Sequence, residues 1–577
     1  MKRVSTWTMA LVTMATLLLS AVTVEPVHGQ TLTTLHSFDG TDGTYPSGLI
    51  QATDGNIYGV TTVGGAYCKG CGTVFNITLA GTLTTLHSFC SEPGCPDGQI
   101  PNGMIQAANG EFYGTTTNGG THGNNGTVFE MPLGGTLTTL HSMDPGSRYP
   151  DRPLIQAADG NFYGDSQGGT NFDGSIYKIN PSGKLTTLYI FCSLSDCPDG
   201  DGPNGLIQAT DGNFYGTTAF GGANSSSCGL GCGTVFKITP GGTLTTLYSF
   251  CSQTNCTDGD YPFEGLIQAN DGNFYGTTHE GGIVTSNCDT GCGTIFKITP
   301  RGTLTTLYSF CSQTNCTDGY IPTGVLVQGT DGNIYGTTTA GGASTGSCGD
   351  GCGTVFQITP GGTLATLYSF CSLTKCADGS QAGALMQDTN GVFYGTSVVG
   401  GVKNDGTVFS LSVGLGPFVA LQTTSGPVGA AVAILGNDLT GSTRVSFNGA
   451  PAMFTVVSAT EITTTVPSGA ATGPVEVTTP GGKLKSNTKY AVKKSPAVPE
   501  FSPGTGTYSK AQSVAITDGS AGSMILYTTD GTPPATSSTA LVYTGPIKVK
   551  STETLEAVAV GIDDEPSAVA AAVYTIL

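Results

Sequence analysis

The chain has 577 residues, enough for several domains at a usual size of roughly 100–200 residues each. It contains 88 glycines, only 11% charged residues and a net charge of −19. This composition excludes coiled coils, helical solenoids and charged disordered chains, and it favours short strands joined by tight turns. The negative charge also argues against nucleic acid as a partner, since nucleic acid attracts basic surfaces.

The N-terminus has the features of a secretory signal peptide. Lys2 and Arg3 precede an apolar run over residues 9–24, and a small-residue cleavage site follows before Gln30. The sequence therefore predicts removal of residues 1–29. We expect the mature chain to have no transmembrane segment and to be secreted, either free outside the cell or held at the cell surface.

A repeat covers about two thirds of the chain. The dipeptide Tyr-Gly recurs every 50–60 residues, at Tyr58, Tyr113, Tyr163, Tyr215, Tyr275, Tyr335 and Tyr394. We expect these tyrosines to pack between the repeats. One repeat, over residues 205–250, predicts four strands at 205–209, 214–218, 233–238 and 243–250, separated by Asp-Gly and Gly-Gly turns. Four-stranded units of this length are typical of propeller blades, so the sequence predicts a seven-bladed β-propeller.

The phase of the repeat predicts how the ring closes. The chain begins with an isolated fourth strand over residues 31–38, and the last repeat ends at its third strand over residues 406–412. The N-terminal strand can therefore complete the last blade and leave no open sheet edge. An open β-solenoid is the alternative.

The repeat also carries a family resemblance. The pattern Gly-Leu-Ile-Gln-Ala-x-Asp-Gly-Asn-Phe-Tyr-Gly-Thr-Thr resembles GloVer-type tandem-repeat proteins, a choice-of-anchor family of exported bacterial proteins. The resemblance spans residues 30–413. It implies an exported bacterial repeat protein and no particular activity.

Two all-β domains follow the repeats. Residues 424–429 (Thr-Ser-Gly-Pro-Val-Gly) and 445–449 (Val-Ser-Phe-Asn-Gly) resemble the IPT/TIG domain, an immunoglobulin-like sandwich. Residues 527–534 (Tyr-Thr-Thr-Asp-Gly-Thr-Pro-Pro) resemble the non-catalytic β-sandwich at the C-terminus of chitobiases and β-hexosaminidases. We therefore expect an all-β chain with a propeller over residues 30–413 and two sandwiches over residues 414–494 and 495–577.

All eighteen cysteines fall into nine close pairs, a pattern typical of disulfides in an exported chain. Zinc binding is the alternative, and a cross-strand bond between Cys232 and Cys251 is also open. Cys192 and Cys197 have no other cysteine in their repeat, so their bond must be local, and we extend that connectivity to the rest. The predicted pairs are Cys68/Cys71, Cys90/Cys95, Cys192/Cys197, Cys228/Cys232, Cys251/Cys256, Cys288/Cys292, Cys311/Cys316, Cys348/Cys352 and Cys371/Cys376.

A recurring aspartate precedes most of the first strands, on the face that carries the cysteine loops. The candidate ligand-binding residues are Asp42, Asp97, Asp199, Asp258, Asp318 and Asp378. A ring of carboxylates favours Ca²⁺ or the hydroxyl groups of a sugar, whereas the alternative is that each aspartate caps its own Asp-Gly turn. Apart from a calcium ion bound by these aspartates, the sequence predicts no cofactor.

The sequence favours a non-enzymatic binding or adhesion protein that recognises an extracellular polysaccharide or another surface component through this acidic face. Its catalytic signals are weak, because His36, His87 and His141 take a strand position that other repeats give to tyrosine. A glycan-processing enzyme using loop carboxylates is the alternative, and the divergent repeat over residues 144–173 is where its two carboxylates are expected. A purely structural surface protein is the third hypothesis.

Overall fold

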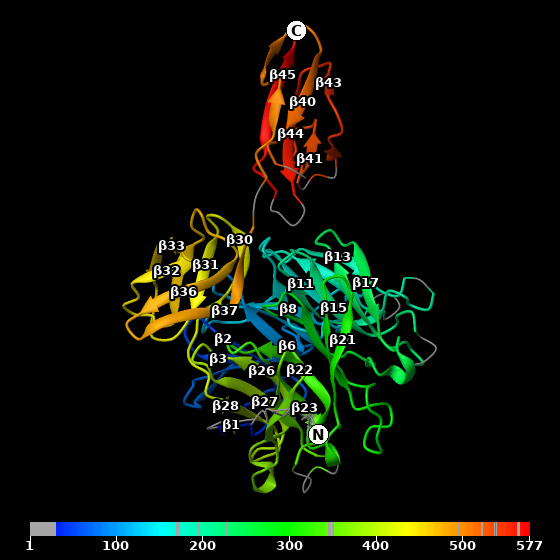
Figure 1. Cartoon of the computed structure of the whole chain (residues 1–577), viewed down its shortest axis with the longest axis vertical. Helices are drawn as coiled ribbons and strands as arrows, with labels where there is room; N and C mark the ends of the chain where they lie inside the picture. The colour runs from blue at the N-terminus through cyan, green and yellow to red at the C-terminus, as the bar shows by residue number, and fades with distance from the viewer. Residues whose placement is uncertain are drawn as a thin grey trace, which may run out of the picture.

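The computed structural model describes residues 30–577 except 169–172, 194, 225–227, 344–347, 349–350, 494–495, 521–522, 536, 538 and 562–565. The predicted signal peptide, residues 1–29, lies outside the described residues. The fold is all-β, as predicted, and only three short 3₁₀ turns interrupt the strands of the described part (Figure 1). No helix in that part is long and apolar enough to cross a bilayer.

Within the described residues, the strands β1 to β28 form seven four-stranded antiparallel sheets. Many of the tight turns between their strands are the predicted Asp-Gly and Gly-Gly sequences, and others have asparagine, alanine, serine or arginine before the glycine. The first sheet contains β2 (Thr44–Gln51), β3 (Ile57–Val63), β4 (Thr73–Ile77) and β5 (Leu83–Ser88), and the second β6 (Gln99–Gln106), β7 (Phe112–Asn118), β8 (Thr127–Met131) and β9 (Thr138–Ser142). The third contains β10 (Ile155–Gln156), β11 (Phe162–Ser166), β12 (Ser175–Ile179) and β13 (Leu185–Ile190), and the fourth β14 (Asp201–Gln208), β15 (Phe214–Phe220), β16 (Thr234–Ile238) and β17 (Leu244–Ser249).

The remaining sheets of the repeat follow the same order. The fifth contains β18 (Ile267–Gln268), β19 (Phe274–Thr278), β20 (Thr294–Ile298) and β21 (Leu304–Ser309), and the sixth β22 (Tyr320–Gln328), β23 (Ile334–Ala340), β24 (Thr354–Ile358) and β25 (Leu364–Ser369). The seventh contains β26 (Ser380–Gln387), β27 (Phe393–Val399), β28 (Thr407–Ser412) and β1 (Thr31–Ser37). The 3₁₀ turns are η1 (Thr254–Cys256), η2 (Thr314–Cys316) and η3 (Thr374–Cys376).

The seventh sheet joins the two ends of the repeat region. Strand β1 pairs antiparallel with β28, with Thr31 opposite Ser412 and Ser37 opposite Thr407. Phe38, which follows β1, packs edge-on against Phe75 of the first sheet at 5.4 Å between ring centroids. The N-terminal strand therefore belongs to the last sheet and also contacts the first.

Aromatic rings pack each sheet against the next. In five of the seven sheets the tyrosine of the Tyr-Gly pair lies against a phenylalanine of the following sheet, as in Tyr58 against Phe112 at 4.5 Å and Tyr215 against Phe274 at 4.1 Å. These tyrosines are buried, so their predicted role in packing between repeats is confirmed. Such contacts add about 0.5–1.5 kcal/mol per pair beyond the area that they bury.

A glutamine at the end of each first strand links neighbouring sheets through the backbone. Gln106 accepts a hydrogen bond from the N–H of Thr53, and Gln268 accepts one from the N–H of Thr210, both at 2.9 Å. The same contact joins the last sheet to the first, where the N–H of Thr389 donates to Gln51 at 3.0 Å. The other members of the series are Gln156, Gln208, Gln328 and Gln387.

The middle part of the chain is a sandwich of two sheets that pack over one core, which includes Val445, Ile462 and Tyr490. One sheet has the order β29 (Ala420–Leu421), β31 (Ala431–Leu435), β35 (Glu461–Thr465) and β34 (Phe454–Val456). The other has the order β30 (Ser425–Pro427), β37 (Gly482–Lys493), β36 (Gly473–Thr479), β32 (Arg444–Phe447) and β33 (Ala450–Ala452).

This middle sandwich lies against the hairpin turns of several repeat sheets. The hydroxyl of Thr460 donates to the carbonyl of Thr53 at 2.6 Å, and the ammonium of Lys489 donates to the carbonyl of Asn270 at 2.9 Å. Asn437 donates to the hydroxyl of Thr389 at 2.7 Å. Because these turns end the first, fifth and seventh sheets at their glutamine ends, the sandwich covers that end of the repeat region.

The C-terminal part is a second sandwich, drawn in orange and red at the far end of the long axis (Figure 1). Its three-stranded sheet contains β38 (Glu500–Ser502), β40 (Gln512–Thr517) and β43 (Ile547–Val549). Its five-stranded sheet contains β39 (Gly506–Tyr508), β45 (Ala570–Ile576), β44 (Glu553–Val560), β41 (Met524–Thr528) and β42 (Leu541–Val542). Val514, Leu555 and Tyr574 form its core.

Deletion of residues 31–38 tests the pairing of β1 with β28. We expect a lower melting midpoint and aggregation, because the deletion exposes the edge of β28 and removes Phe38 from its contact with Phe75. Thermal unfolding and light scattering measure both effects, and the two sandwiches should stay folded because each has its own core. An unchanged midpoint in a monomeric deletion variant would contradict this expectation.

Candidate functional site

The structure does not gather the six predicted aspartates into one site. Each lies in the loop that connects the fourth strand of one sheet to the first strand of the next, beside the residues of its own repeat. Asp199, Asp258, Asp318 and Asp378 are buried, whereas Asp42 and Asp97 are partly exposed.

Three of the four buried aspartates, Asp258, Asp318 and Asp378, bond to the cysteine loop that precedes them, whereas one oxygen of Asp199 has no hydrogen-bond partner among the described residues. The hydroxyl of Tyr248 donates to Asp258 at 2.7 Å, and the N–H groups of Ser252 and Gln253 donate to the same carboxylate at 2.9 and 3.2 Å. Asp318 and Asp378 have the same three kinds of donor. Both oxygens of these carboxylates therefore accept hydrogen bonds from the preceding cysteine loop, and the donors are not those of the Asp-Gly turn that the capping alternative names.

Histidine replaces the tyrosine donor on β1 and on β5. The Nε2 atom of His36 lies 2.7 Å from Asp42, and that of His87 lies 3.0 Å from Asp97. In the third repeat, the hydroxyl of Tyr189 donates to Asp199 at 2.8 Å. His36, His87 and the tyrosines thus bond the aspartate of the loop, whereas the Nε2 atom of His141 has no hydrogen-bond partner among the described residues.

All eighteen cysteines form disulfides in the predicted local pairs, and the described residues contain no free cysteine. The loop disulfides also support the first strand of the following sheet. The N–H of Tyr261 donates to the carbonyl of Cys232 at 3.2 Å, and the N–H of Ile321 donates to that of Cys292 at 3.1 Å. The cysteine loops therefore fix backbone groups at or just before the first strand of the following sheet.

Those supported positions have an unusual backbone. In six of the seven sheets a residue other than glycine has φ between 54° and 61°, a left-handed conformation that is rare for tyrosine and rarer for isoleucine. Such conformations persist only where the surroundings impose them, and they concentrate at functional sites. The six residues are Tyr45, Ile100, Tyr149, Tyr261, Ile321 and Gln381.

The first strand is broken in two sheets by one extra residue. The second and fourth repeats have Pro-Asn-Gly at residues 101–103 and 203–205, whereas the third has Pro-Asp-Arg-Pro at 150–153 and the fifth has Pro-Phe-Glu-Gly at 262–265. Strands β10 and β18 consequently shrink to 2 residues each, against 8 in β6 and β14. The sixth repeat also gains a residue, but Gly324, at a φ of 75°, lets β22 continue past the irregularity.

The two interruptions bring charged residues of different sheets together. One Nη atom of Arg152 donates to the carbonyl of Phe263 at 2.6 Å and to the side chain of Asn204 at 3.2 Å, so Arg152 reaches from the third sheet across the fourth to the fifth. Its guanidinium also lies over the ring of Phe263, at 4.8 Å from the centroid. Although burial opposes it, the charges of Glu264, Asp151 and Asp165 raise the pKa of Arg152.

Asp165 is the most unusual member of this group. It replaces the threonine that follows Tyr-Gly in most other repeats, it is 1% exposed, and it accepts one hydrogen bond from the N–H of Gly205 at 3.2 Å. Burial, and then the charge of Asp151, raise the pKa of Asp165 to about 8 although Arg152 opposes the change. Its second oxygen and the buried hydroxyl of Tyr177 have no hydrogen-bond partner among the described residues.

We call Asp151, Arg152, Asp165, Tyr177 and Glu264 the central cluster. Burial also raises the pKa of Asp151, again against the effect of Arg152. Buried acids with perturbed pKa values and unsatisfied polar atoms are the usual signature of a binding or catalytic site. The residues can exchange protons or bond polar groups of a ligand.

Four half-exposed aromatic rings lie beside the central cluster, and we call them the aromatic group: Phe220, Tyr261, Phe263 and His279. Tyr261 stacks on Phe263 at 5.5 Å, and His279 lies 4.9 Å from Phe263. Phe220 contacts Tyr261 at 5.1 Å. Burial, and then the charge of Arg152, lower the pKa of His279 to about 4, so this ring is neutral near pH 7.

Sequence reasoning singled out residues 144–173 as the divergent repeat, but it did not identify any member of the central cluster. The extra residue in the third and fifth repeats and the exchange of threonine for Asp165 were visible signals. The tertiary structure alone brings Glu264 and the aromatic group to the third repeat, because these residues lie one to two repeats further along the chain.

The fold and site together define an all-β repeat protein with two appended sandwiches and a buried ionic centre. The profile of the Gloeobacter/Verrucomicrobia repeat matches residues 20–226 and 155–409, more than half of the chain. The chain therefore belongs to the Gloeobacter/Verrucomicrobia repeat family. The IPT/TIG domain matches residues 418–492, and the chitobiase/β-hexosaminidase C-terminal domain matches residues 503–571.

No curated protein matches the chain. Solved structures that resemble it include an extracellular domain from B. thetaiotaomicron, described as part of a hybrid two component system, with 12% identity and a TM-score of 0.43. That match covers 95% of this chain and 59% of the other, so the chain spans less than two thirds of that protein's length. A fungal alcohol oxidase in complex with copper (12% identity, TM-score 0.40, 80% and 98% covered) and the calcium-binding regucalcin of Agrobacterium tumefaciens (14%, 0.33, 67% and 93%) also match.

The variant Asp258→Asn tests whether the predicted aspartates bind calcium. We expect the substitution to lower stability by about 1–3 kcal/mol without calcium, because an asparagine amide cannot accept all of the loop hydrogen bonds. Calcium should change the melting midpoint of either protein little, since it would have to displace donors that already satisfy the carboxylate. A midpoint of the natural chain that rises steeply with calcium, and no longer does so in Asp258→Asn, would show a calcium site.

The variant Asp165→Thr tests the buried acid, because it restores the residue of the other repeats. The folded chain keeps the Asp165 proton up to a pH of about 8, whereas the unfolded chain loses it near the ordinary pKa of 3.8. The contribution of Asp165 is therefore most favourable below about pH 4 and is lost as the pH rises through 8. Melting midpoints from pH 4 to 9 should move progressively in favour of Asp165→Thr, and a difference independent of pH would contradict the raised pKa.

Proposed function

We propose that residues 1–29 are a signal peptide and that the mature chain acts outside the cell as a seven-bladed propeller over residues 30–413. The propeller is followed by the two sandwiches over residues 414–494 and 495–577. The pairing of β1 with β28 and the hydrogen bond between Gln51 and Thr389 support closure of the ring. The nine disulfides support an oxidising compartment.

The protein binds an extracellular glycan at the central cluster and the aromatic group. The observation that carries this proposal is the meeting of Asp151, Arg152 and Glu264 with the half-exposed rings of Tyr261 and Phe263. Carboxylates and guanidinium groups bond sugar hydroxyls, and aromatic rings pack on the apolar faces of sugar rings. Both kinds of group converge here from the third, fourth and fifth sheets.

The charge of the site limits the class of glycan. Asp260 and Glu280 lie beside the aromatic group, where each N–H donates to the carbonyl of the other at 3.0 Å. Together with Glu264 and Asp151 they outnumber the single positive charge of Arg152. An acidic site disfavours sulfated or uronic-acid glycans and favours neutral or amino-bearing ones.

The access to the site also favours binding from one side. The middle sandwich contacts the hairpin turns at the glutamine ends of the sheets, so a ligand approaches from the face with the cysteine loops. In this proposal Asp42, Asp97, Asp199, Asp258, Asp318 and Asp378 shape that face by holding its loops, and direct ligand contact by these residues stays a prediction. The match of residues 503–571 to a domain of chitobiases adds support for a link with glycans.

Glycoside hydrolysis is the second candidate function, and the neighbouring acids Asp151 and Asp165 favour it. Asp151 and Asp165 lie in the divergent repeat, and the raised pKa of Asp165 keeps one proton available near neutral pH. A protonated acid beside a second carboxylate is the pair that cleavage of a glycosidic bond uses. Binding remains the first candidate function, because it accounts for both the acids and the aromatic group, whereas hydrolysis accounts for the acids alone.

A panel of neutral, amino-bearing and acidic oligosaccharides tests binding by the mature chain. We expect calorimetric binding of a neutral or amino-bearing member, and a loss of about tenfold or more in affinity for Phe263→Ala, since this ring lies against Arg152. The matched control is Tyr45→Ala, which changes an exposed tyrosine with the same left-handed backbone in the first sheet. It should leave the affinity unchanged.

The same incubations separate the alternatives. Released reducing ends that disappear in Asp165→Asn would support the enzyme in place of the binding protein. Binding that survives Phe263→Ala would place the ligand elsewhere, and no binding by any member of the panel would favour the purely structural surface protein.

A further inference from the structure

The disulfides of the described chain are not independent of one another. Every repeat with a cysteine pair in the loop before the third strand also has a pair after the fourth strand, and eighteen residues always separate the two pairs. We call these four groups the sulfur clusters: Cys68, Cys71, Cys90 and Cys95; Cys228, Cys232, Cys251 and Cys256; Cys288, Cys292, Cys311 and Cys316; Cys348, Cys352, Cys371 and Cys376. The pair Cys192–Cys197 stands alone.

The structure brings the two pairs of each cluster into contact across one hairpin. In the clusters that contain Cys232 and Cys352, all four sulfur atoms lie within 4.8 Å of one another. In the other two clusters three sulfur atoms do so, and the fourth is bonded to one of them. The Sγ atoms of Cys348 and Cys371, which are not bonded to each other, are 3.5 Å apart.

This spacing is close to that of a zinc site. Zinc with four thiolate ligands at about 2.3 Å in a tetrahedron separates the sulfur atoms by about 3.8 Å. Two short cysteine pairs separated by fifteen to twenty residues are also the usual ligand pattern of structural zinc sites. The disulfide Cys192–Cys197 shows that a pair after the fourth strand can occur without a second cysteine pair in the same repeat. The presence of both pairs in four other repeats therefore needs a separate explanation.

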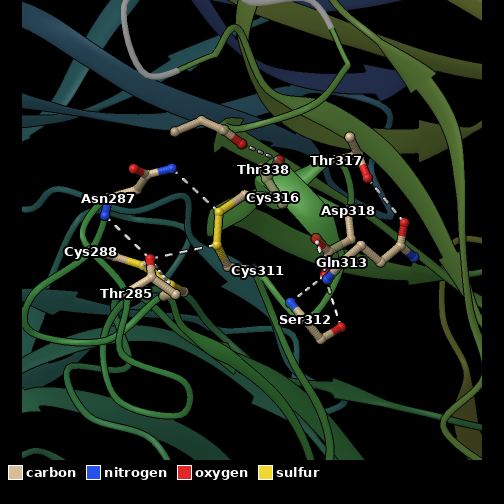
Figure 2. Close-up of a disulfide and its surroundings, with 12 residues drawn as sticks. Thr285, Asn287, Cys288, Cys311, Ser312, Gln313, Cys316, Thr317, Asp318 and Thr338 are labelled. Atoms are coloured by element: carbon tan, nitrogen blue, oxygen red, sulfur yellow. Dashed lines mark hydrogen bonds between the residues drawn. A yellow bond between two sulfur atoms is a disulfide. The ribbon is translucent and has the colours of Figure 1, made fainter.

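The surroundings of one cluster contain donors suited to thiolates (Figure 2). The hydroxyl of Thr285 lies 3.2 Å from the Sγ atom of Cys288 and 3.7 Å from that of Cys311. The side-chain amide of Asn287 donates to the Sγ atom of Cys316 at 3.5 Å. All four cysteines of this cluster are at most 9% exposed, which shields a bound ion from water. Such outer contacts orient ligands and adjust their affinity for the metal.

We propose that each sulfur cluster binds one Zn²⁺ ion through four thiolates when the chain is reduced, and forms two disulfides when it is oxidised. Two molecules of a dithiol reductant supply four electrons, each becoming a disulfide as it converts one protein disulfide into two thiols. The four thiols then release four protons as they bind the ion. Oxidation reverses the sequence and releases zinc.

Cobalt titration of the mature chain tests this proposal. The chain is reduced without oxygen by a water-soluble phosphine, which becomes the phosphine oxide, and Co²⁺ and then Zn²⁺ are added. We expect four equivalents of Co²⁺, one for each cluster, with the sulfur-to-metal charge-transfer band and the intense visible bands of tetrahedral cobalt, and displacement by Zn²⁺. The oxidised chain should bind none in this way.

Two double variants serve as matched controls. Cys251→Ser with Cys256→Ser should reduce the count to three, whereas Cys192→Ser with Cys197→Ser should leave it at four. If the reduced chain unfolds, circular dichroism measures whether it refolds when the metal is added. Refolding on metal addition would support the proposed zinc sites. Absence of the charge-transfer band in the reduced chain, folded or not, overturns the proposal, as does a count that Cys251→Ser with Cys256→Ser does not change.

Discussion

The packing of each four-stranded sheet against its two neighbours is the interaction on which the rest of the repeat region depends. A single twisted sheet of this size cannot bury both of its faces, so each repeat relies on the next one. Tyrosine against phenylalanine provides the apolar part of the contact, as in Tyr215 on Phe274. The glutamine at the end of each first strand provides the polar part, since its side chain bonds the backbone of the neighbouring sheet. Both contacts use side chains that recur in the repeat. A repeat can therefore change its sequence at other positions and still pack against its neighbours.

The central cluster lies where the third and fifth repeats differ in sequence from the others. In three repeats the threonine in the position of Asp165 bonds a backbone carbonyl of the next repeat: Thr115 donates to Arg152 at 2.9 Å, Thr217 to Glu264 at 2.9 Å and Thr337 to Gly383 at 2.8 Å. An acid in this place gains one hydrogen bond from Gly205 and leaves its other oxygen unsatisfied, so the exchange opposes folding. Groups that oppose folding and lie next to an arginine, a second acid and partly exposed aromatic rings are typical of sites that selection keeps for function.

The cysteine loops support the first strands of the sheets, on which the aromatic group begins. These loops contain few apolar residues, and their disulfides and buried aspartates hold them in one conformation. The carbonyl groups of Cys232 and Cys292 then bond the backbone of Tyr261 and Ile321, which have left-handed conformations. A change in the sulfur atoms would therefore be transmitted through the backbone to the first strands, where the aromatic group begins.

The sequence by itself determined the fold class, the repeat, the local cysteine pairs and the packing role of the Tyr-Gly tyrosines, because these depend on residues close together in the chain and on a pattern repeated seven times. It also indicated the divergent repeat at residues 144–173. Only the tertiary structure decided that the recurring aspartates lie apart in separate loops, because each bonds its own repeat. It alone joined Arg152 to Phe263, since a contact between the third and fifth sheets depends on how the sheets are arranged in space, and no local pattern encodes that arrangement.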